Sequence, residues 1–161
     1  MPLPGTWLGV HIDQIALLAP DLQPAMAAYH ANLGVTFRVF EVDETNSSFS
    51  GSSATFRTRI AVTLNGPSIE IIQPVAGTTL HSEHLRVRGP GLHHLGVYVD
   101  ELSQAVESLS SRGYKKILEG KIDRVSEFAY FDAGEMHCII EPLHLSSELP
   151  LFLAEHGQSY P

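Results

Sequence analysis

Residues 91–102 have the sequence GLHHLGVYVDEL, which predicts a short buried strand followed by a helix. The apolar, partly β-branched run 92–99 indicates the strand, and Asp100-Glu101 ahead of apolar residues at positions 102, 105, 106 and 109 indicates the helix. Two adjacent histidines, His93 and His94, lie inside this strand. Because side chains alternate faces along a strand, we expect them to point in opposite directions, one of them into the interior.

Residues 12–22, IDQIALLAPDL, repeat this pattern 80 positions earlier in the chain, so that Gln14 corresponds to His94. The segments 68–72 (SIEII) and 139–143 (IIEPL) resemble each other in the same way. An internal repeat constrains the architecture, because each copy is expected to form the same structural unit. The sequence therefore predicts two copies of a strand–helix–strand–strand–strand unit.

Caps and turns outline the remaining elements. Asp21 is the expected N-cap of the first helix, and Gly34 and Gly113 stand where the two helices should end. Asn65-Gly66 predicts a hairpin turn. The predicted strands are 10–19, 36–42, 55–63, 68–74, 116–119, 128–132 and 136–143, with a polar loop at 43–53 and a linker at 75–90.

These elements place the chain in the α+β class, as one domain over residues 1–161. The two units cover residues 10–74 and 91–144, and a C-terminal tail covers 145–161. The tail contains an apolar patch at 149–153, which we expect to pack on the parent domain.

Composition excludes several classes of function. The chain has 161 residues with 10 Lys and Arg against 18 Asp and Glu, a net charge of −8, which argues against binding to nucleic acid or to an anionic membrane. Cys138 is the single cysteine, so no intrachain disulfide is possible, and a buried thiol in a reducing compartment is expected. No apolar run approaches the ~18 residues of a membrane span. We therefore expect a soluble, cytoplasmic protein.

Four polar residues occupy matching places in the two units: Gln14 and His94 in the first strands, Glu70 and Glu141 in the last. A carboxylate inside an apolar strand is unfavourable unless it is paired or coordinates a metal. One nitrogen and three oxygen donors suit a divalent ion such as Zn, Ni, Co or Mn. The competing interpretation is structural, with Arg57 or Arg59 of the neighbouring hairpin pairing with a mid-strand glutamate.

The quoted segments together resemble the vicinal oxygen chelate superfamily over roughly residues 10–144. This superfamily includes glyoxalase I and methylmalonyl-CoA epimerase, and the His-His strand is especially similar to the epimerase. The resemblance implies paired βαβββ modules that form an open, cup-shaped, eight-stranded sheet around one divalent metal ion. It places the metal ligands at Gln14, Glu70, His94 and Glu141, and it implies a homodimer.

The sequence also departs from the patterns of both relatives. Leu18 and Pro90 stand where glyoxalase I has its arginines, and Gln14 stands where the epimerase has histidine. The second catalytic glutamate of the epimerase should fall among Arg57, Thr58 and Arg59. Extradiol ring cleavage requires two histidines and one carboxylate for iron, and Gln14 argues against it.

The resemblance implies a metal-dependent isomerase, epimerase or lyase that stabilises an enolate or enediolate while an α-proton is transferred. Glu141 and Glu70 are the expected catalytic residues, and the substrate is a small carbonyl compound or an acyl thioester. His137 shares strand parity with Glu141 and is a candidate second proton carrier, although a solvent-exposed histidine at a strand end is the favoured interpretation. The alternative function is a metal-free protein that binds a hydrophobic compound on the same fold.

Overall fold

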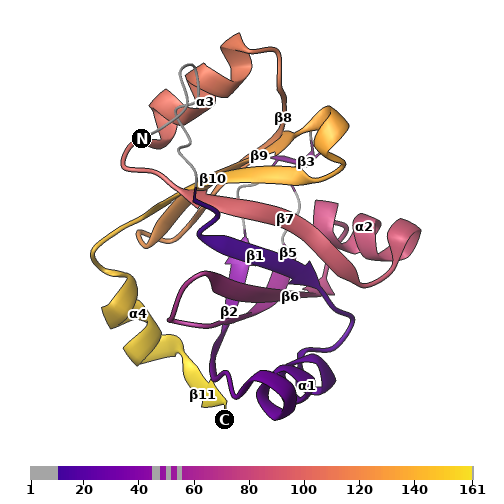
Figure 1. Cartoon of the computed structure of the whole chain (residues 1–161), viewed down its shortest axis with the longest axis vertical. Coiled ribbons are helices and arrows are strands. Elements are labelled where there is room, and N and C mark those ends of the chain that lie inside the picture. The colour runs from indigo at the N-terminus through magenta and orange to yellow at the C-terminus, as the bar shows by residue number, and fades with distance from the viewer. Residues whose placement is uncertain (1–10, 45–47, 50–51, 54–55, 161) are drawn as a thin grey trace.

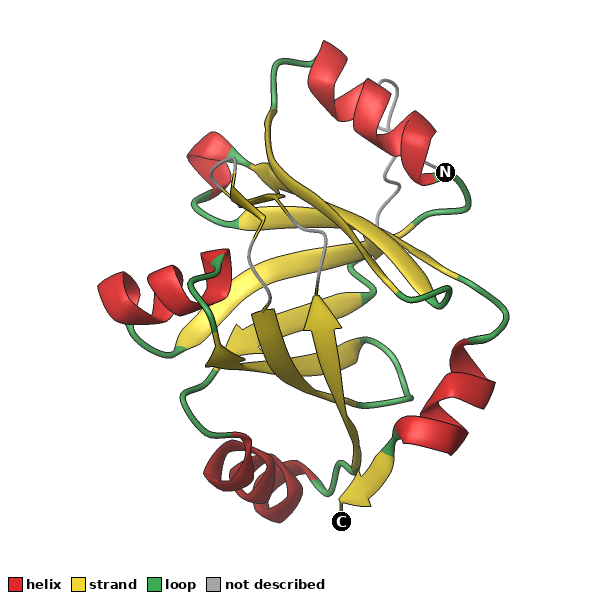
Figure 2. Cartoon of the chain, turned by 180° about the vertical axis from the view of Figure 1, so that it is seen from behind, coloured by secondary structure: helices red, strands yellow, loops and turns green. Residues whose placement is uncertain are grey.

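A computed structural model describes residues 11–44, 48–49, 52–53 and 56–160 of the chain. In this part of the chain a mixed sheet of nine strands is surrounded by helices (Figures 1 and 2). The strand order is β11-β2-β5-β6-β1-β7-β10-β9-β8. The strands of the main sheet are β1 (Gln14–Leu18), β2 (Phe37–Glu44), β5 (Phe56–Val62), β6 (Ser68–Ala76), β7 (Gly91–Tyr98), β8 (Lys115–Ile122), β9 (Ser126–Asp132), β10 (Ile139–Leu145) and β11 (Gln158–Tyr160).

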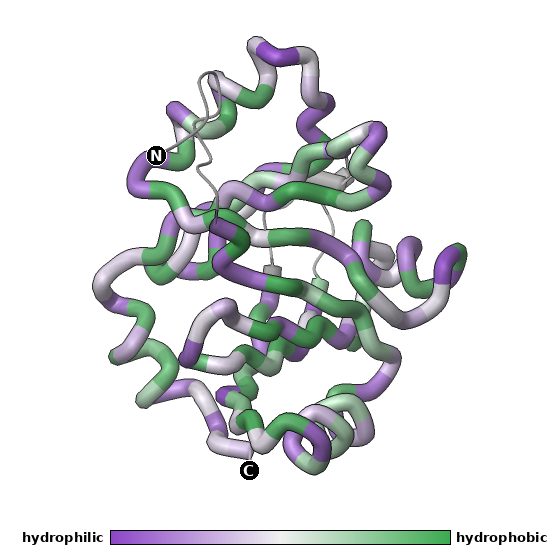
Figure 3. Tube along the Cα trace, viewed as in Figure 1, coloured by the Kyte–Doolittle hydropathy of each residue, from purple (hydrophilic) through white to green (hydrophobic). Residues whose placement is uncertain are grey.

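The predicted repeat is confirmed as two βαβββ units. In the first, β1 pairs in parallel with β6, and in the second, β7 pairs in parallel with β10. The units join where β1 pairs antiparallel with β7, which places β6, β1, β7 and β10 side by side at the centre of an open sheet. Figure 3 shows that hydrophobic residues are frequent along these central strands.

The helices of the two units are α1 (Leu22–Leu33) and α3 (Leu102–Ser111). As predicted, the Asp21 side chain caps α1 by accepting a hydrogen bond from the amide of Gln23, and Gly34 ends that helix in the left-handed conformation. Met26 of α1 is fully buried against the first half of the sheet, and Leu109 of α3 is buried against the second. No helix in the described ranges is long and apolar enough to span a membrane.

The prediction of a linker at residues 75–90 is wrong in part. This segment contains helix α2 (Leu80–Arg88), which begins at a capping box formed by Thr79 and Ser82. The helix is short and carries mostly polar side chains, so its apolar periodicity is weak. It nevertheless buries His81 against the sheet, which brings an unpredicted side chain to the interior.

The expectation that His93 and His94 point in opposite directions is also wrong. The pairing of β7 with β1 slips by one residue between Ala16 and Leu17, and His93 is the extra residue of this β-bulge. Both imidazoles are buried, and their Nδ1 atoms lie 2.8 Å apart. Strand alternation fails here because a bulge locally re-aims the side chains.

The C-terminal tail packs on the sheet, as predicted. Helix α4 (Leu149–His156) buries Leu153 in a cluster with Phe40 and Ile60. Strand β11 then pairs with β2 at the edge of the sheet, so the sheet has one strand more than the expected eight.

Three smaller differences concern element ends. The first strand begins at Gln14, and Val10 lies outside the described residues. In the expected polar loop 43–53, the short strands β3 (Ser48–Phe49) and β4 (Ser52–Ser53) pair with each other. The expected turn after β9 is the 3-10 helix η1 (Gly134–Met136), so β10 begins later than predicted and Cys138 lies just before it as a half-buried free thiol.

Candidate active site

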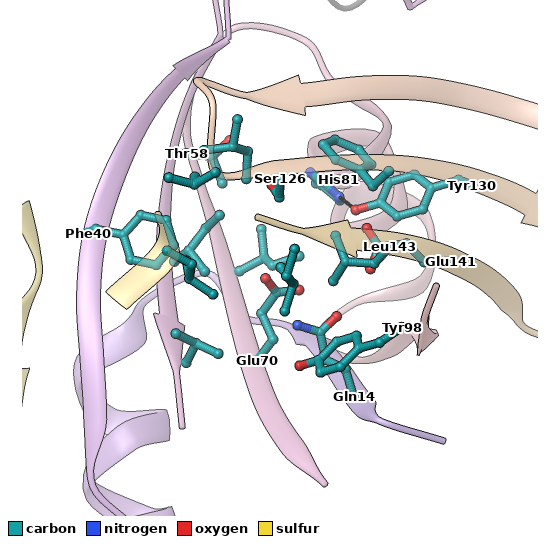
Figure 4. Close-up of a pocket in the computed structure, with 18 residues that line it drawn as sticks. Gln14, Phe40, Thr58, Glu70, His81, Tyr98, Ser126, Tyr130, Glu141 and Leu143 are labelled. Carbon is teal, nitrogen blue, oxygen red and sulfur yellow. Dashed lines mark hydrogen bonds between the residues drawn. The ribbon is translucent and has the colours of Figure 1, made fainter. Parts of the chain in front are cut away.

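A cavity of about 80 Å³ lies inside the cup, between the two halves of the sheet. Gln14, Glu70 and Glu141 contribute its polar lining from three of the central strands. Phe40 lies across the cavity from Tyr130 and Glu141 (Figure 4). The cavity therefore has a polar end formed by the central strands and an apolar end formed by the outer strands.

The structure brings all four predicted ligand residues together. Gln14 lies on β1, Glu70 on β6, His94 on β7 and Glu141 on β10, which are neighbouring strands. His94 Nε2 lies 3.0 Å from Glu141 Oε2 and 3.5 Å from Glu70 Oε2. His94 is fully buried, and Gln14 and Glu141 are each only 5% exposed.

Two small residues make this approach possible. Ala16 pairs with both Glu70 and His94 in the ladder, and Gly96 pairs with both Gln14 and Glu141. A Cβ atom built on Gly96 would lie 2.8 Å from both Cβ and Oε1 of Gln14, closer than real Cβ contacts allow. The absent side chain at Gly96 thus leaves the space that the amide of Gln14 occupies.

Two buried polar atoms of this group have no well-aligned hydrogen-bond partner among the described residues: Gln14 Oε1 and His94 Nε2. The contact of His94 with Glu141 is close enough for an ion pair but is not oriented as a hydrogen bond. Buried polar groups are rarely left in this state unless water, an ion or a ligand completes them.

The carboxylates control the protonation of this group in the absence of a metal. Burial acts to lower the pKa of His94, but Glu141 and Glu70 outweigh it and raise the pKa to about 9. Burial raises the pKa of Glu141, although His94 acts in the opposite direction. His94 is therefore a cation in the metal-free protein, held between two acidic side chains.

The four residues fit a divalent metal ion in donor chemistry, and the distances from His94 to the two glutamates are consistent with it. Two donors about 2.1 Å from one ion, at angles of about 90–110°, lie about 3.0–3.4 Å apart. The separations of 3.0 and 3.5 Å from His94 Nε2 are close to this range. Within the described ranges, however, no three His, Cys, Asp or Glu side chains form a preassembled metal centre. Binding would have to draw these side chains around the ion.

Among the residues that the structure describes, no arginine pairs with Glu70 or Glu141. Arg57 and Arg59 lie on the outer face of β5, where they contact Glu41 and Asp43 at 3.3–3.7 Å. His137 does not share a face with Glu141. It is exposed, has a φ of 54° and ends η1 before β10 begins, so the favoured solvent-exposed interpretation holds.

Sequence reasoning missed two side chains that line the cavity, His81 and Tyr130. His81 Nε2 lies 3.1 Å from the hydroxyl of Tyr130, which in turn hydrogen-bonds the carboxyl group of Glu141. Burial lowers the pKa of His81 to about 3, so its imidazole is neutral. The capping box at Thr79 and Ser82 was the signal for the helix that carries His81.

Comparison with known families gives a match over residues 13–131, to the family described as "Glyoxalase/Bleomycin resistance protein/Dioxygenase superfamily". The chain belongs to this superfamily. This confirms the family suggested by the His-His strand and its repeat. No curated protein matches the sequence.

Several solved structures share the fold of this chain at low sequence identity. A hypothetical protein of Bacillus halodurans has a TM-score of 0.65 at 14% identity, covering 85% of this chain and 95% of its own. Methylmalonyl-CoA epimerase of Mycobacterium tuberculosis has a TM-score of 0.60 at 18% identity, covering 86% and 90%. The Streptomyces coelicolor methylmalonyl-CoA epimerase, in complex with 2-nitronate-propionyl-CoA, has a TM-score of 0.60 at 15% identity, covering 86% and 99%. At such identities the likeness establishes the fold alone.

Proposed function

We propose that this protein is a divalent-metal-dependent isomerase, epimerase or lyase that transfers an α-proton on a small carbonyl compound or acyl thioester. The observation that carries the proposal is the convergence of Gln14, Glu70, His94 and Glu141 beside a largely apolar cavity, which the amide and the two carboxylates line. Gln14 Oε1 is buried there and has no hydrogen-bond partner among the described residues. Zn, Ni, Co and Mn suit this donor set.

A divalent ion bound there would polarise the substrate carbonyl and stabilise the enolate formed when the α-proton leaves. Glu141 is the favoured base, because burial raises the pKa of its carboxyl group and so strengthens it as a proton acceptor. Tyr130 would orient that carboxyl group through the hydrogen bond it makes. Glu70 is the second carboxylate in reach of the same region and is the candidate for returning the proton.

Elemental analysis of the purified full-length protein is the first test, performed on the native sequence and on His94→Ala. We expect about one divalent ion per chain in the native protein and its loss in the variant. Absence of bound metal after incubation with Zn, Ni, Co and Mn salts would refute the metal-dependent function.

The proton transfer is tested separately by following exchange of the α-proton of enolisable thioesters in D₂O by NMR. Glu141→Gln should abolish enzyme-dependent exchange while the circular dichroism spectrum stays native. Full exchange activity in this variant would remove Glu141 from the proposed role.

A metal-free binding protein on the same fold is the second candidate, and the apolar lining around Phe40 and Ile60 favours it. The two functions differ in metal content, which the same elemental analysis measures. For either function we expect a cytoplasmic homodimer, on the basis of the family resemblance and the composition.

A further inference from the structure

The lysine and arginine side chains of this protein all lie outside the lining of the candidate site. The sequence contains ten Lys and Arg residues, and all ten lie in the part of the chain that the structure describes. None of them lines the cavity, and none lines an adjoining cavity of about 400 Å³. The two cavities share Val62, Tyr98, Leu145 and Leu149, so the second forms the mouth of the first.

The register of β5 decides this distribution. Arg57 and Arg59 point to the outer face, while Thr58 between them is 1% exposed and lines the cavity. The hydroxyl of Thr58 is buried and has no hydrogen-bond partner among the described residues. At this point of β5 the cavity is therefore lined by an uncharged hydroxyl group, while the guanidinium groups of the two adjacent residues lie on the outer face.

The histidines near the site do not supply a free positive charge either. His81 is neutral, because burial lowers its pKa to about 3. His94 is already paired with Glu70 and Glu141. With a metal bound, these two carboxylates would balance the charge of a divalent ion. His11, at the mouth, has Asp13 beside it in the same lining.

Much of the cavity lining is apolar. Phe40, Ile60 and Ile122 contribute to it from three strands, and Leu149 of α4 lines both this cavity and its mouth. The volume of about 80 Å³ is roughly half the ~150 Å³ of a protein cavity that holds benzene. A short acyl chain fits this space, and a bulkier remainder of the molecule would extend through the mouth.

From these observations we infer that the substrate is an uncharged carbonyl compound or thioester whose reacting acyl group is short, apolar and free of a carboxylate. The inference rests on the proposed function for the location of the reacting carbonyl. It separates this protein from the methylmalonyl-CoA epimerases among its structural neighbours. An anionic acyl group would enter a site with two carboxylates and no unpaired cation, which costs binding energy.

Two N-acetylcysteamine thioesters of equal shape test the inference: the 2-methylacetoacetyl thioester, which is neutral, and the methylmalonyl thioester, which carries a carboxylate in place of the methyl ketone. Dissociation constants are measured by calorimetry on the zinc-loaded and the metal-free full-length protein. We expect the neutral thioester to bind at least about tenfold more tightly in both forms. Equal or tighter binding of the methylmalonyl thioester, or no binding of either at millimolar concentration, would overturn the inference.

A charge added at the mouth provides the matched variant. Val62 is half-buried and lines both cavities, so in Val62→Lys the ammonium group can reach the mouth while its stem stays on apolar surface. The preference for the neutral thioester should shrink by about fivefold or more, whereas Val62→Met should keep it. Leu145→Lys serves the same purpose if Val62→Lys does not fold. An unchanged preference in a folded lysine variant would contradict the electrostatic explanation.

These results are separable from those of the proposed function. Binding preference is read without turnover and in the metal-free protein as well, whereas the proposed function depends on metal content and α-proton exchange. A protein that prefers the neutral thioester but retains no metal would keep the inference about ligand class and lose the enzymatic function.

Discussion

Gly96→Ala tests whether the close packing of β1 against β7 is what positions Gln14. Gly96 lies opposite both Gln14 and Glu141 in the ladder, and a Cβ atom there would approach Gln14 Cβ and Oε1 to 2.8 Å. Carbon atoms in contact lie about 3.5–4.0 Å apart, so the strand or the side chain must move by about 0.7–1.2 Å.

A shift of this size is large compared with the tolerance of a metal site. Metal–ligand distances in proteins stay within about 0.2 Å of their preferred values, so the amide of Gln14 would no longer reach the ion. We expect zinc affinity to fall by about 10- to 100-fold, the scale seen when the support of a ligand is lost. Overpacking should also reduce the free energy of unfolding by about 1–3 kcal/mol.

Zinc affinity is measured by competition with a chromophoric chelator, and stability by urea unfolding of the metal-free protein. Gly120→Ala is the matched control, because a Cβ atom there would lie 2.7 Å from the ring of Phe128, in a strand that carries none of the four candidate ligands. The control should lose stability and keep its zinc affinity. If Gly96→Ala binds zinc within about threefold of the native protein, the proposed role of Gln14 is refuted.

Three further outcomes are expected. His93→Leu removes the partner of His94 Nδ1 and should weaken zinc binding about 10- to 100-fold. His93→Asn should retain most of the zinc affinity, because its side-chain oxygen can accept the same hydrogen bond. Equal losses in the two variants would exclude a role of His93 in positioning His94. Leu153→Ala should lower the free energy of unfolding, measured by urea titration, by about 2–5 kcal/mol, because the side chain of Leu153 is only 4% exposed. A smaller loss would mean that α4 packs loosely on the sheet. Because the pKa of His94 is raised to about 9 in the metal-free protein, zinc must displace its proton at neutral pH, and zinc affinity should fall as pH falls. Calorimetry of zinc binding in buffers of different ionisation enthalpy should show that about one proton is released. Identical binding enthalpies in all buffers would contradict this prediction.

The sequence predicted the fold because the two units repeat their pattern at a constant spacing. Gln14 and His94 occupy corresponding strands, and Glu70 and Glu141 close the two units, so one comparison of the chain with itself brought all four residues to attention. The parallel pairing of the first and last strand within each unit then places these positions on neighbouring strands. Symmetry of the chain thus carries information about the site that no single residue carries.

Helix α2 and the bulge at His93 were not predicted, for identifiable physical reasons. Helix α2 lies between the units, has no counterpart in the other half and shows little apolar periodicity, although Thr79 and Ser82 mark its start. The bulge at His93 depends on how β7 pairs with β1, which is a property of two segments and not of either sequence alone. Both features bring buried imidazoles to the site, and so the sequence accounts for the candidate ligands better than for their surroundings.

The charge of the cavity lining also depends on strand pairing, which the sequence of one segment does not determine. Arg57, Thr58 and Arg59 are consecutive, and the sequence left open which of them faces inward. In a strand the two faces exchange when the register slips by one residue, so a slip in β5 would place both arginines in the cavity and Thr58 outside. The register that places Thr58 inward is set by the pairing of β5 with β2, which runs without a shift, and the shift in the pairing of β5 with β6 is an extra residue, Val75, on β6. Whether the site accepts an anionic or a neutral substrate therefore depends on a one-residue register and not on composition. The net charge of the protein, here −8, therefore does not determine the charge of the cavity lining.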